Sequence, residues 1–195
     1  KLPFYDQQGF IFSGLALLLI IPAALILASY VKTLEIGSQI TTAAIGSDKI
    51  FYTYETIERA FPYAVRNATI IKKNGRVEVK IYPKQIQSFM QIMKYNFSKD
   101  VYAMVDITNC IIDVTIKEKE KTERTRIIIP TDGNLVTIIE YEEEEEETKT
   151  QSIDKPVKIK GKTLDRIEAS LPTVIKEPFL NIIKSGNIFT TIRDP

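Results

Sequence analysis

The sequence predicts an α+β fold, in which a long N-terminal α-helix is followed by an antiparallel β-rich head domain with short helices. Three features lead to this prediction. Residues 7–31 are uncharged, apolar residues then recur with helical spacing, and segments rich in Ile, Val and Thr alternate with turn residues after Asn67. We therefore expect residues 1–33 to form an apolar helix, residues 34–66 its amphipathic continuation, and residues 67–195 the head domain.

Residues 10–31 have the length and composition of one membrane span. They are apolar apart from two serines, one tyrosine, Gly14 and Pro22. At about 1.5 Å per residue, a helix of this stretch measures roughly 33 Å, close to the ~30 Å hydrocarbon layer of a bilayer. The stretch lacks the basic start, the short apolar core and the cleavage site of a secretory signal. We expect it to be retained and to pack in lipid or against copies of itself.

The composition argues against several classes of function. With 26 basic and 25 acidic side chains, the net charge of +1 gives no general attraction to nucleic acid, so no such partner is expected. The lone Cys110 cannot form an intramolecular disulfide, and its neighbours Ile111 and Ile112 indicate a small buried side chain rather than a reactive thiol. The absence of His removes the commonest general base and metal ligand. The lack of His and Trp and the abundance of Ile, Lys and Glu are typical of a thermophile.

A seam of apolar residues continues beyond the membrane span at alternating steps of four and three residues, as on one face of a helix. One helix is therefore predicted to run through both zones, about 80 Å from Gly9 to Phe61 at the standard rise. Pro22 should kink it, and Pro62 should end or break it. The seam is expected to pack on the head domain, and the alternative is an intermolecular coiled coil, which the irregular charges beside the seam disfavour. The seam residues are Ile36, Ile40, Ala43, Ser47, Ile50, Tyr54, Ile57, Phe61 and Ala64.

The head domain is predicted to begin with a β-hairpin around Asn74-Gly75, the strongest short hairpin signal in the chain. A helix is expected over residues 84–95, where Ile86, Phe89, Met90 and Met93 have helical spacing. Strands rich in Ile, Val and Thr should then form an antiparallel meander. The predicted strands of the hairpin and the meander are residues 69–73, 76–82, 101–117, 125–129 and 135–141.

The alternation of apolar residues slips near Asn109 and Cys110, which predicts a β-bulge at that point. The remaining predicted elements are an edge strand over residues 157–160, a short helix over 164–171, a helix over 174–183 that is interrupted at Pro178, and a closing strand over 188–192.

Six consecutive glutamates, Glu142 to Glu147, form the densest charge cluster of the chain. Because like charges repel, we expect a solvated loop or a frayed strand end. A calcium loop is the alternative, but it would need spaced oxygen ligands and a turn glycine, which this run lacks. The lysines expected to neutralise the run are Lys149, Lys155, Lys158, Lys160 and Lys162.

The sequence contains no motif that indicates catalysis. Asp106 and Asp113 lie in an apolar strand, but a separation of seven residues places them on opposite faces unless a bulge intervenes. There is no nucleophile elbow, glycine-rich phosphate loop or paired cysteine motif. We therefore expect no catalytic residues, no cofactor and no metal site, and we do not expect an enzyme.

Two triplets have the pattern of N-glycosylation acceptors, Asn67-Ala68-Thr69 and Asn96-Phe97-Ser98. Each lies near the predicted end of a helix in or beside the head domain. Asn67 and Asn96 are possible modification sites if they are exposed in a glycosylating compartment.

The segment Gly9-Phe10-Ile11-Phe12-Ser13 stands directly before the apolar helix, which continues as a long amphipathic helix into a β-rich head. In this arrangement about the first 60 residues resemble the archaeal type IV pilin-like proteins. The chain departs from the bacterial-type pattern, because Gly14 stands at the fifth place after Gly9, where such pilins have glutamate. Since residues 1–9 are present, we expect any processing to have preceded Lys1.

The resemblance implies a structural subunit of an extracellular filament, used in adhesion or surface attachment. The N-terminal helices would bundle as its core and the heads would form its outer surface. The partners would be copies of the chain or related pilin-like subunits, with the subunit held in the cell membrane before assembly and its head outside. The alternative is a single-pass, membrane-anchored extracytoplasmic subunit of a cell-surface complex. The residues expected to pack in the helix core are Phe10, Phe12, Gly14, Leu15, Leu18, Leu19, Pro22, Leu25 and Leu27.

Overall fold

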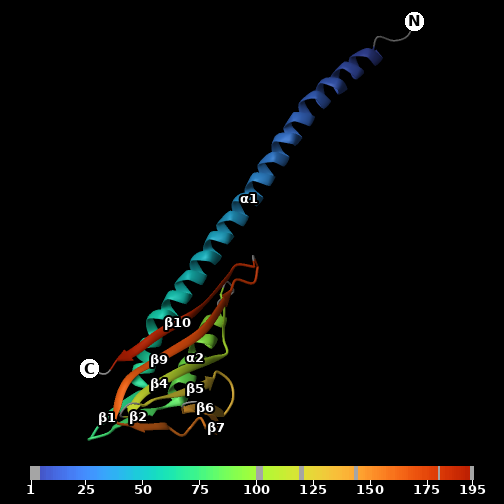
Figure 1. The fold of residues 1–195 in the computed structure, drawn as a ribbon. Coiled ribbons are helices and arrows are strands. Elements are labelled where there is room, and N and C mark those ends of the chain that lie inside the picture. The colour runs from blue at the N-terminus through green and yellow to red at the C-terminus, as the bar shows by residue number, and fades with distance from the viewer. Residues whose placement is uncertain (1–4, 100–102, 119–120, 143–144, 180, 194–195) are drawn as a thin grey trace. The chain divides into compact units, whose positions relative to one another are not determined.

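The computed structural model describes the backbone of residues 5–99, 103–118, 121–142, 145–179 and 181–193, and the side chains of these from Leu19 onward except Ser98, Glu118 and Glu142 (Figure 1). The chain divides into two compact units, residues 1–45 and residues 46–195. The predicted α+β class is confirmed, since a long N-terminal helix precedes antiparallel sheets and one shorter helix.

Helix α1 spans Tyr5–Asn67 and contributes to both units. The predicted end or break at Pro62 is wrong. A proline removes one backbone donor and crowds the preceding turn, which normally breaks a helix. Here the flanking Phe61 and Val65 are fully buried, and the helical hydrogen bonds continue to the backbone N–H of Ala68 at 3.0 Å. The packing of these side chains therefore outweighs the local preference of proline.

A small antiparallel sheet has the order β1-β2-β8. Strands β1 (Thr69–Lys73) and β2 (Val77–Ile81) form the predicted hairpin, and β8 (Val157–Gly161) is the predicted edge strand. Gly75 has a φ of 72° in the connecting turn, a backbone conformation that glycine adopts without strain. One face of β2 is buried and the other is partly exposed, which fixes the face that points to the core.

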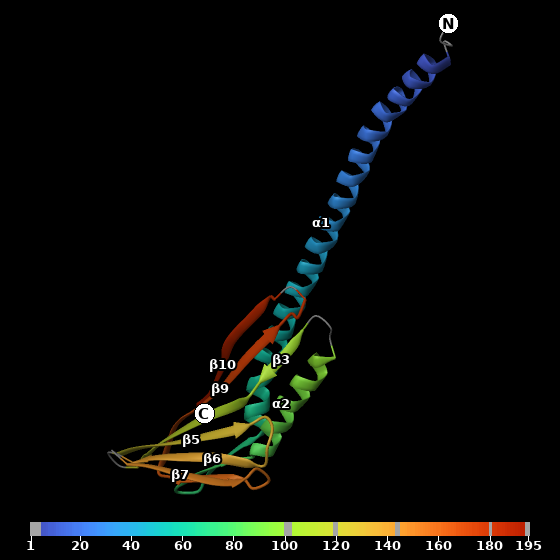
Figure 2. The ribbon, with the colours of Figure 1, turned by 90° about the vertical axis from the view of Figure 1, so that its right-hand side faces the viewer.

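Helix α2 (Pro83–Ser98) matches the helix predicted over residues 84–95. It begins with Pro83 in its first turn, where the missing N–H of proline leaves no helical bond unmade. Its Phe89 ring lies 6.3 Å from the Phe61 ring of α1, measured between ring centroids. Figure 2 shows α2 running beside the part of α1 that belongs to the second unit.

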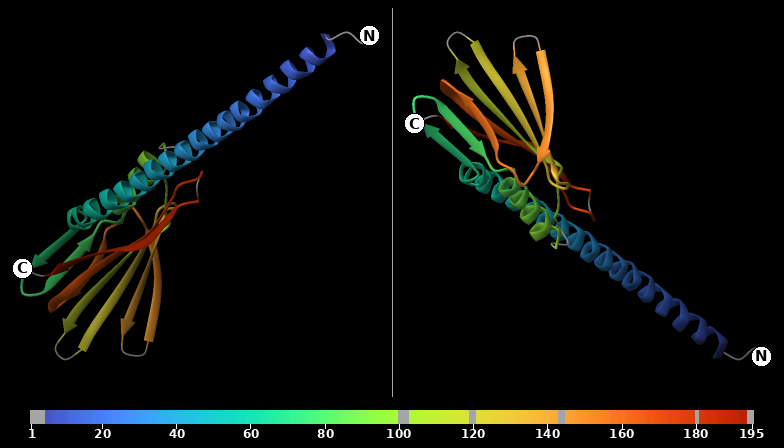
Figure 3. Two further views of the ribbon diagram at one scale, coloured as in Figure 1. Left: turned by 90° about the horizontal axis from the view of Figure 1, so that it is seen from above. Right: turned by 90° about the horizontal axis from the view of Figure 1, so that it is seen from below.

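The large sheet has seven strands in the order β10-β9-β4-β5-β6-β7, with β3 paired to β9 as well. Every pairing is antiparallel, which confirms the predicted meander. Figure 3 shows α2 and the second-unit part of α1 on the same side of the fanned strands. The strands are β3 (Met104–Ile107), β4 (Asn109–Glu118), β5 (Lys121–Pro130), β6 (Leu135–Glu142), β7 (Glu145–Ser152), β9 (Thr163–Lys176) and β10 (Ile183–Arg193).

The predicted slip near Asn109 and Cys110 is present as a break between β3 and β4. Ile107 pairs with Thr173 of β9, whereas Ile111 pairs with Ser170, so one extra residue lies between β3 and β4. The insertion changes the parity of the strand, and the buried residues are Val105 and Ile107 before it and Cys110, Ile112, Val114 and Ile116 after it.

The helices predicted over residues 164–171 and 174–183 are both wrong, because strand β9 fills most of this region. Leu164, Ile167 and Leu171 are buried at a helix-like spacing of three and four residues. The step of three arises from a register shift beside Asp165, which adds one residue to β9 opposite β4. The step of four is ordinary strand alternation, since Ala169 between Ile167 and Leu171 is buried as well. Pro178 lies in the connection that leads from β9 to β10, and β10 contains the predicted closing strand over 188–192.

Candidate assembly surface

The large apolar side chains described in the first unit are exposed. Leu19, Leu25 and Leu27, three of the residues predicted to pack in a helix core, are 67%, 64% and 67% exposed, and Pro22 is exposed as well. Within the part of the chain whose side chains are described, α1 is the one helix long and apolar enough to cross a membrane. Phe10, Phe12, Gly14, Leu15 and Leu18 lie in the helical backbone, but their side chains fall outside the described residues.

Three threonine hydroxyls of this helix are satisfied locally. The Thr33 hydroxyl donates to the Ser29 carbonyl at 2.8 Å, and Thr41 and Thr42 donate to carbonyls four residues earlier at 2.9 Å each. A hydroxyl that bonds its own helix needs no partner from water. Lipid or other apolar helices can therefore surround these threonines of α1 without leaving their hydroxyl donors unpaired.

The predicted seam divides at the boundary between the units. In the second unit Ile50, Ile57 and Phe61 are fully buried in the head, and Tyr54 packs against the same core. Ser47 and Ala64 are partly buried. In the first unit Ala43 is partly exposed, and Ile36 and Ile40 are 48% and 64% exposed. Packing of the seam on the head is therefore observed for its second half, and for Ile36, Ile40 and Ala43 it stays a prediction.

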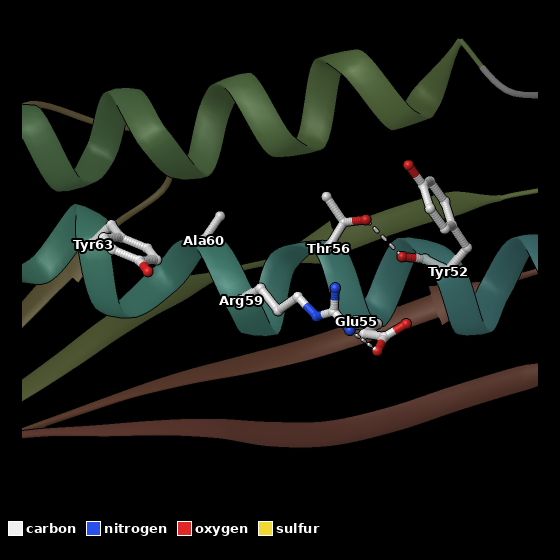
Figure 4. A pocket seen from close by; sticks show the side chains of 6 residues that line it. All are labelled: Tyr52, Glu55, Thr56, Arg59, Ala60 and Tyr63. Atoms are coloured by element: carbon white, nitrogen blue, oxygen red, sulfur yellow. Dashed lines mark hydrogen bonds and ion pairs between the residues drawn. The ribbon is translucent and has the colours of Figure 1, made fainter.

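A shallow hollow of about 380 Å³ lies on the exposed side of α1, away from the buried seam (Figure 4). The exposed rings of Tyr52 and Tyr63 stand at its two ends, with the small Thr56 between them. Arg59 donates to the Glu55 carboxylate at 2.6 Å, so these two charges of the hollow neutralise each other. Ala60 completes the lining. The sequence prediction missed this hollow, although the recurrence of Tyr52, Thr56 and Tyr63 at helical spacing could have indicated a second face.

The two aspartates considered for acid–base chemistry do not form a site. Asp106 is exposed, whereas Asp113 accepts hydrogen bonds from Arg126 Nε at 2.9 Å and Arg124 at 2.7 Å. Burial raises the pKa of Asp113, but the hydrogen bonds and charges of the two arginines outweigh burial and hold the pKa below its usual value. The arrangement is a structural ion-pair network on the outer face of the large sheet.

The lone thiol is enclosed by the core. Cys110 is fully buried, and burial raises the pKa of its thiol far above the usual range. A neutral thiol is a poor nucleophile. Among the described residues, no group of three or more carboxylate or Cys side chains is placed to hold a metal ion.

The described glutamates of the run are solvated and lie at a strand end, one of the two predicted arrangements, and not in a loop. Glu145, Glu146 and Glu147 are exposed and begin strand β7, which pairs with β6. Lys149 bridges Glu140 and Glu147 at 2.7 and 3.0 Å, and these bonds raise its pKa to about 12. None of the other lysines expected to neutralise the run, Lys155, Lys158, Lys160 and Lys162, forms an ion pair with a described glutamate. Glu143 and Glu144 lie outside the described residues.

Both candidate acceptor asparagines are accessible. Asn67 is exposed at the end of α1, and Asn96 is exposed near the end of α2. The Thr69 hydroxyl of the first triplet donates to the Val65 carbonyl at 2.8 Å. Exposure is a requirement for glycosylation and does not by itself indicate that it occurs.

Comparisons with known proteins give no relative for the chain: no family model, no curated protein and no solved structure matches it. The functional argument therefore depends on the sequence and the geometry described above.

Proposed function

We propose that the chain is a structural subunit of an extracellular type IV pilus-like filament. Its apolar N-terminal helix would pack against the same helix of neighbouring copies, and the β-rich head would form the outer surface for adhesion or attachment. The observation that carries this proposal is the division of α1. The apolar side chains described between Leu19 and Val31 are exposed, while the second half of the helix is built into the core of the head.

The energetics of such an exchange support the proposal. An apolar helix in a bilayer can replace lipid neighbours with other apolar helices at little hydrophobic cost, because lipid tails and Leu or Ile side chains are similarly apolar. Association then depends on close packing, for which small residues are suited. The small residues of this stretch are Gly14, Ala16, Ala23, Ala24 and Ala28.

The second candidate is a membrane tether that holds the head outside the cell as part of a surface complex. The same observation supports it, since a single apolar helix also suffices to anchor a domain. The two functions differ in what surrounds residues 19–31: copies of the chain in a filament, or lipid and unrelated proteins around a tether.

Paired substitutions in the full chain test this difference. Ala24→Ile keeps the helix apolar but obstructs close approach, whereas Leu25→Ile is a matched change that preserves side-chain volume. If the helices form a filament core, Ala24→Ile should reduce the number of filaments seen by negative-stain microscopy at least several-fold, with the membrane-bound amount unchanged. Leu25→Ile should leave both unchanged.

Cross-linking gives an independent readout. Because Cys110 is buried, a cysteine placed at Ala24 would be the accessible thiol of the chain. Copies that share a helix core should yield intermolecular disulfides in the assembled material. Purified particles in which this helix contacts only lipid or unrelated chains would contradict the filament and leave the tether.

A further inference from the structure

The outer face of the small sheet is strongly basic. The register places Lys72, Glu78 and Lys160 in one row across β1, β2 and β8, and Ile70, Lys80 and Lys158 in the next row. These residues alternate with the buried positions of β2, so they lie on the face that points away from the core. Four lysines and one glutamate share this surface, which we call the basic face. Its residues are Ile70, Lys72, Glu78, Lys80, Lys158 and Lys160.

Most of this positive charge has no ion-pair partner among the described residues. Lys80 lies 3.7 Å from Glu78, which neutralises one lysine. Lys72, Lys158 and Lys160 are exposed and make no ion pair with any described residue. Lys158 and Lys160 share β8, and Lys158 lies directly opposite Lys80 of β2. Like charges placed in this way repel one another, which is unfavourable unless an anion screens them.

The matching negative charge is carried by a different part of the same head. In the β6–β7 hairpin, Glu140 pairs in register with Glu147, and Glu145 and Glu146 follow toward the tip. Lys149 is the lysine that bonds this group, through Glu140 and Glu147. Glu145 and Glu146 are exposed and have no ion-pair partner among the described residues. We call Glu140, Glu145, Glu146 and Glu147 the acidic hairpin.

We propose that the basic face of one copy binds the acidic hairpin of a second copy. The chain is nearly neutral, with 26 basic and 25 acidic residues, so the two surfaces are a local separation of charge rather than an excess of one sign. Complementary patches of this kind steer association and fix the relative placement of two partners. Exposed Ile70, 40% accessible, lies within the basic face and offers an apolar contact at its edge.

The contact joins two different surfaces, so it is heterologous. Each copy that binds through its basic face still presents a free acidic hairpin, and the series can continue without closing. This proposal adds a contact between heads to the filament. It rests on the proposed function only in that the filament is where the contact would form. Each ion pair is weak in water, but several pairs act together in this contact, and copies held along one core would further raise their effective concentration.

Charge exchange in the full-length protein tests the proposal. One variant carries Lys158→Glu and Lys160→Glu, and the other carries Glu145→Lys and Glu146→Lys. Self-association in detergent would be measured by analytical ultracentrifugation at about 0.02 M and 0.5 M NaCl, which span the range over which surface charges become screened. Wild-type association should weaken about tenfold or more between these salt concentrations. Each variant alone should fail to associate at low salt, because its two surfaces then carry the same sign.

The mixture of the two variants is the decisive sample. The reversed face of one then complements the reversed hairpin of the other, and the two unchanged surfaces also match, so association should return to the wild-type level. A control with Lys99→Glu and Lys176→Glu makes the same change in net charge at exposed lysines outside both surfaces. This control should associate like the wild type.

Failure of the mixture to associate, or unchanged association of the separate variants, would overturn the proposal. If the wild-type chain does not self-associate but binds heparin through Lys158 and Lys160, the basic face takes a foreign polyanion and the proposal is likewise wrong. The test is independent of the filament, because the charge variants leave the N-terminal helix unchanged and any association through that helix would not respond to them. Charge-dependent association of heads without any filament on cells would overturn the filament alone.

Discussion

Gly161 of β8 lies directly against Ile116 of β4, at the place where the two sheets meet. Gly161 is buried and ends the small sheet opposite Val77, while Ile116 is buried in the large sheet beside the register shift. A Cβ atom at position 161 would overlap the Ile116 side chain. The absence of a side chain at this one position therefore allows the two sheets to share a core.

We expect Gly161→Ala to destabilise the head by about 1–3 kcal/mol, the usual cost of forcing an extra methyl group into a packed interior. Gly37→Ala is the matched control, because nothing lies within 4 Å of a Cβ at that helical position. It should be neutral or stabilising by up to about 1 kcal/mol, since alanine favours a helix. Thermal unfolding followed by circular dichroism measures both, and equal midpoints for the two variants would contradict the proposed close contact.

Phe61→Ala should lower the free energy of unfolding by about 3–5 kcal/mol, because it removes a fully buried ring and its contact with Phe89. Tyr63→Ala removes a ring of similar size from the exposed side of the same helix. Its effect should stay within about 0.5 kcal/mol. Urea unfolding distinguishes the two, and a large loss from Tyr63→Ala would show that the hollow side of α1 is packed in the isolated chain.

The ion-pair network of Asp113 should make stability sensitive to acid. Its pKa is lowered in the folded protein, so its contribution is fully present above the unfolded value near 3.8 and is lost as the pH falls through the lower, folded value. Asp113→Asn should therefore destabilise the protein at pH 7, and the difference from the wild type should shrink below about pH 4. Urea midpoints between pH 7 and pH 2 measure this, with Asp106→Asn at an exposed position as the control. A difference that is independent of pH would contradict the assigned role of the carboxylate.

Cys110 should react with a thiol reagent only when the head opens. The thiol is buried and its pKa is raised, so the reactive thiolate is scarce in the folded state. We expect labelling by a disulfide reagent at pH 8 to be at least about 100-fold slower than in denaturant, since it requires transient unfolding. Rapid labelling of the native protein would contradict the described core.

The sequence predicted best those elements in which the turn or helix signals and the spacing of the buried residues indicate the same structure. The hairpin at Asn74-Gly75 and helix α2 combine turn or helix signals with one consistent apolar period. The slip at Asn109 was also predictable, because an insertion in a strand leaves a visible change of parity. In each case the information lies within a few residues of the element.

Strand β9 could not be read in the same way. The residue added at Asp165 places Leu164 three positions before Ile167, and with Leu171 they have the spacing of a helical face, although all three are buried in a strand. Only the pairing with β4 shows that an insertion, rather than a change of period, produced this pattern. The continuation of α1 through Pro62 has a related cause, because the contacts that maintain it come from residues distant in sequence.

The candidate assembly surface was predictable in composition but not in placement. The apolar helix follows directly from the composition of residues 10–31. The seam, in contrast, changes from exposed to buried side chains within one helix, and the spacing of its residues gives no sign of that change. The lysines near the glutamate run were expected to neutralise it because they are close in sequence. The structure separates them, since Lys158 and Lys160 belong to β8 in the small sheet and Glu145–Glu147 to β7 in the large one.

The separation of lysines and glutamates onto two sheets also governs how the protein behaves as a solute. Its isoelectric point is about 7.9, so near pH 8 the average repulsion between molecules vanishes while local patches of both signs persist. Solubility should therefore pass through a minimum close to that pH at low salt and recover when salt is added. A buffer well below pH 7 or one of moderate ionic strength is the suitable medium for keeping single molecules in solution.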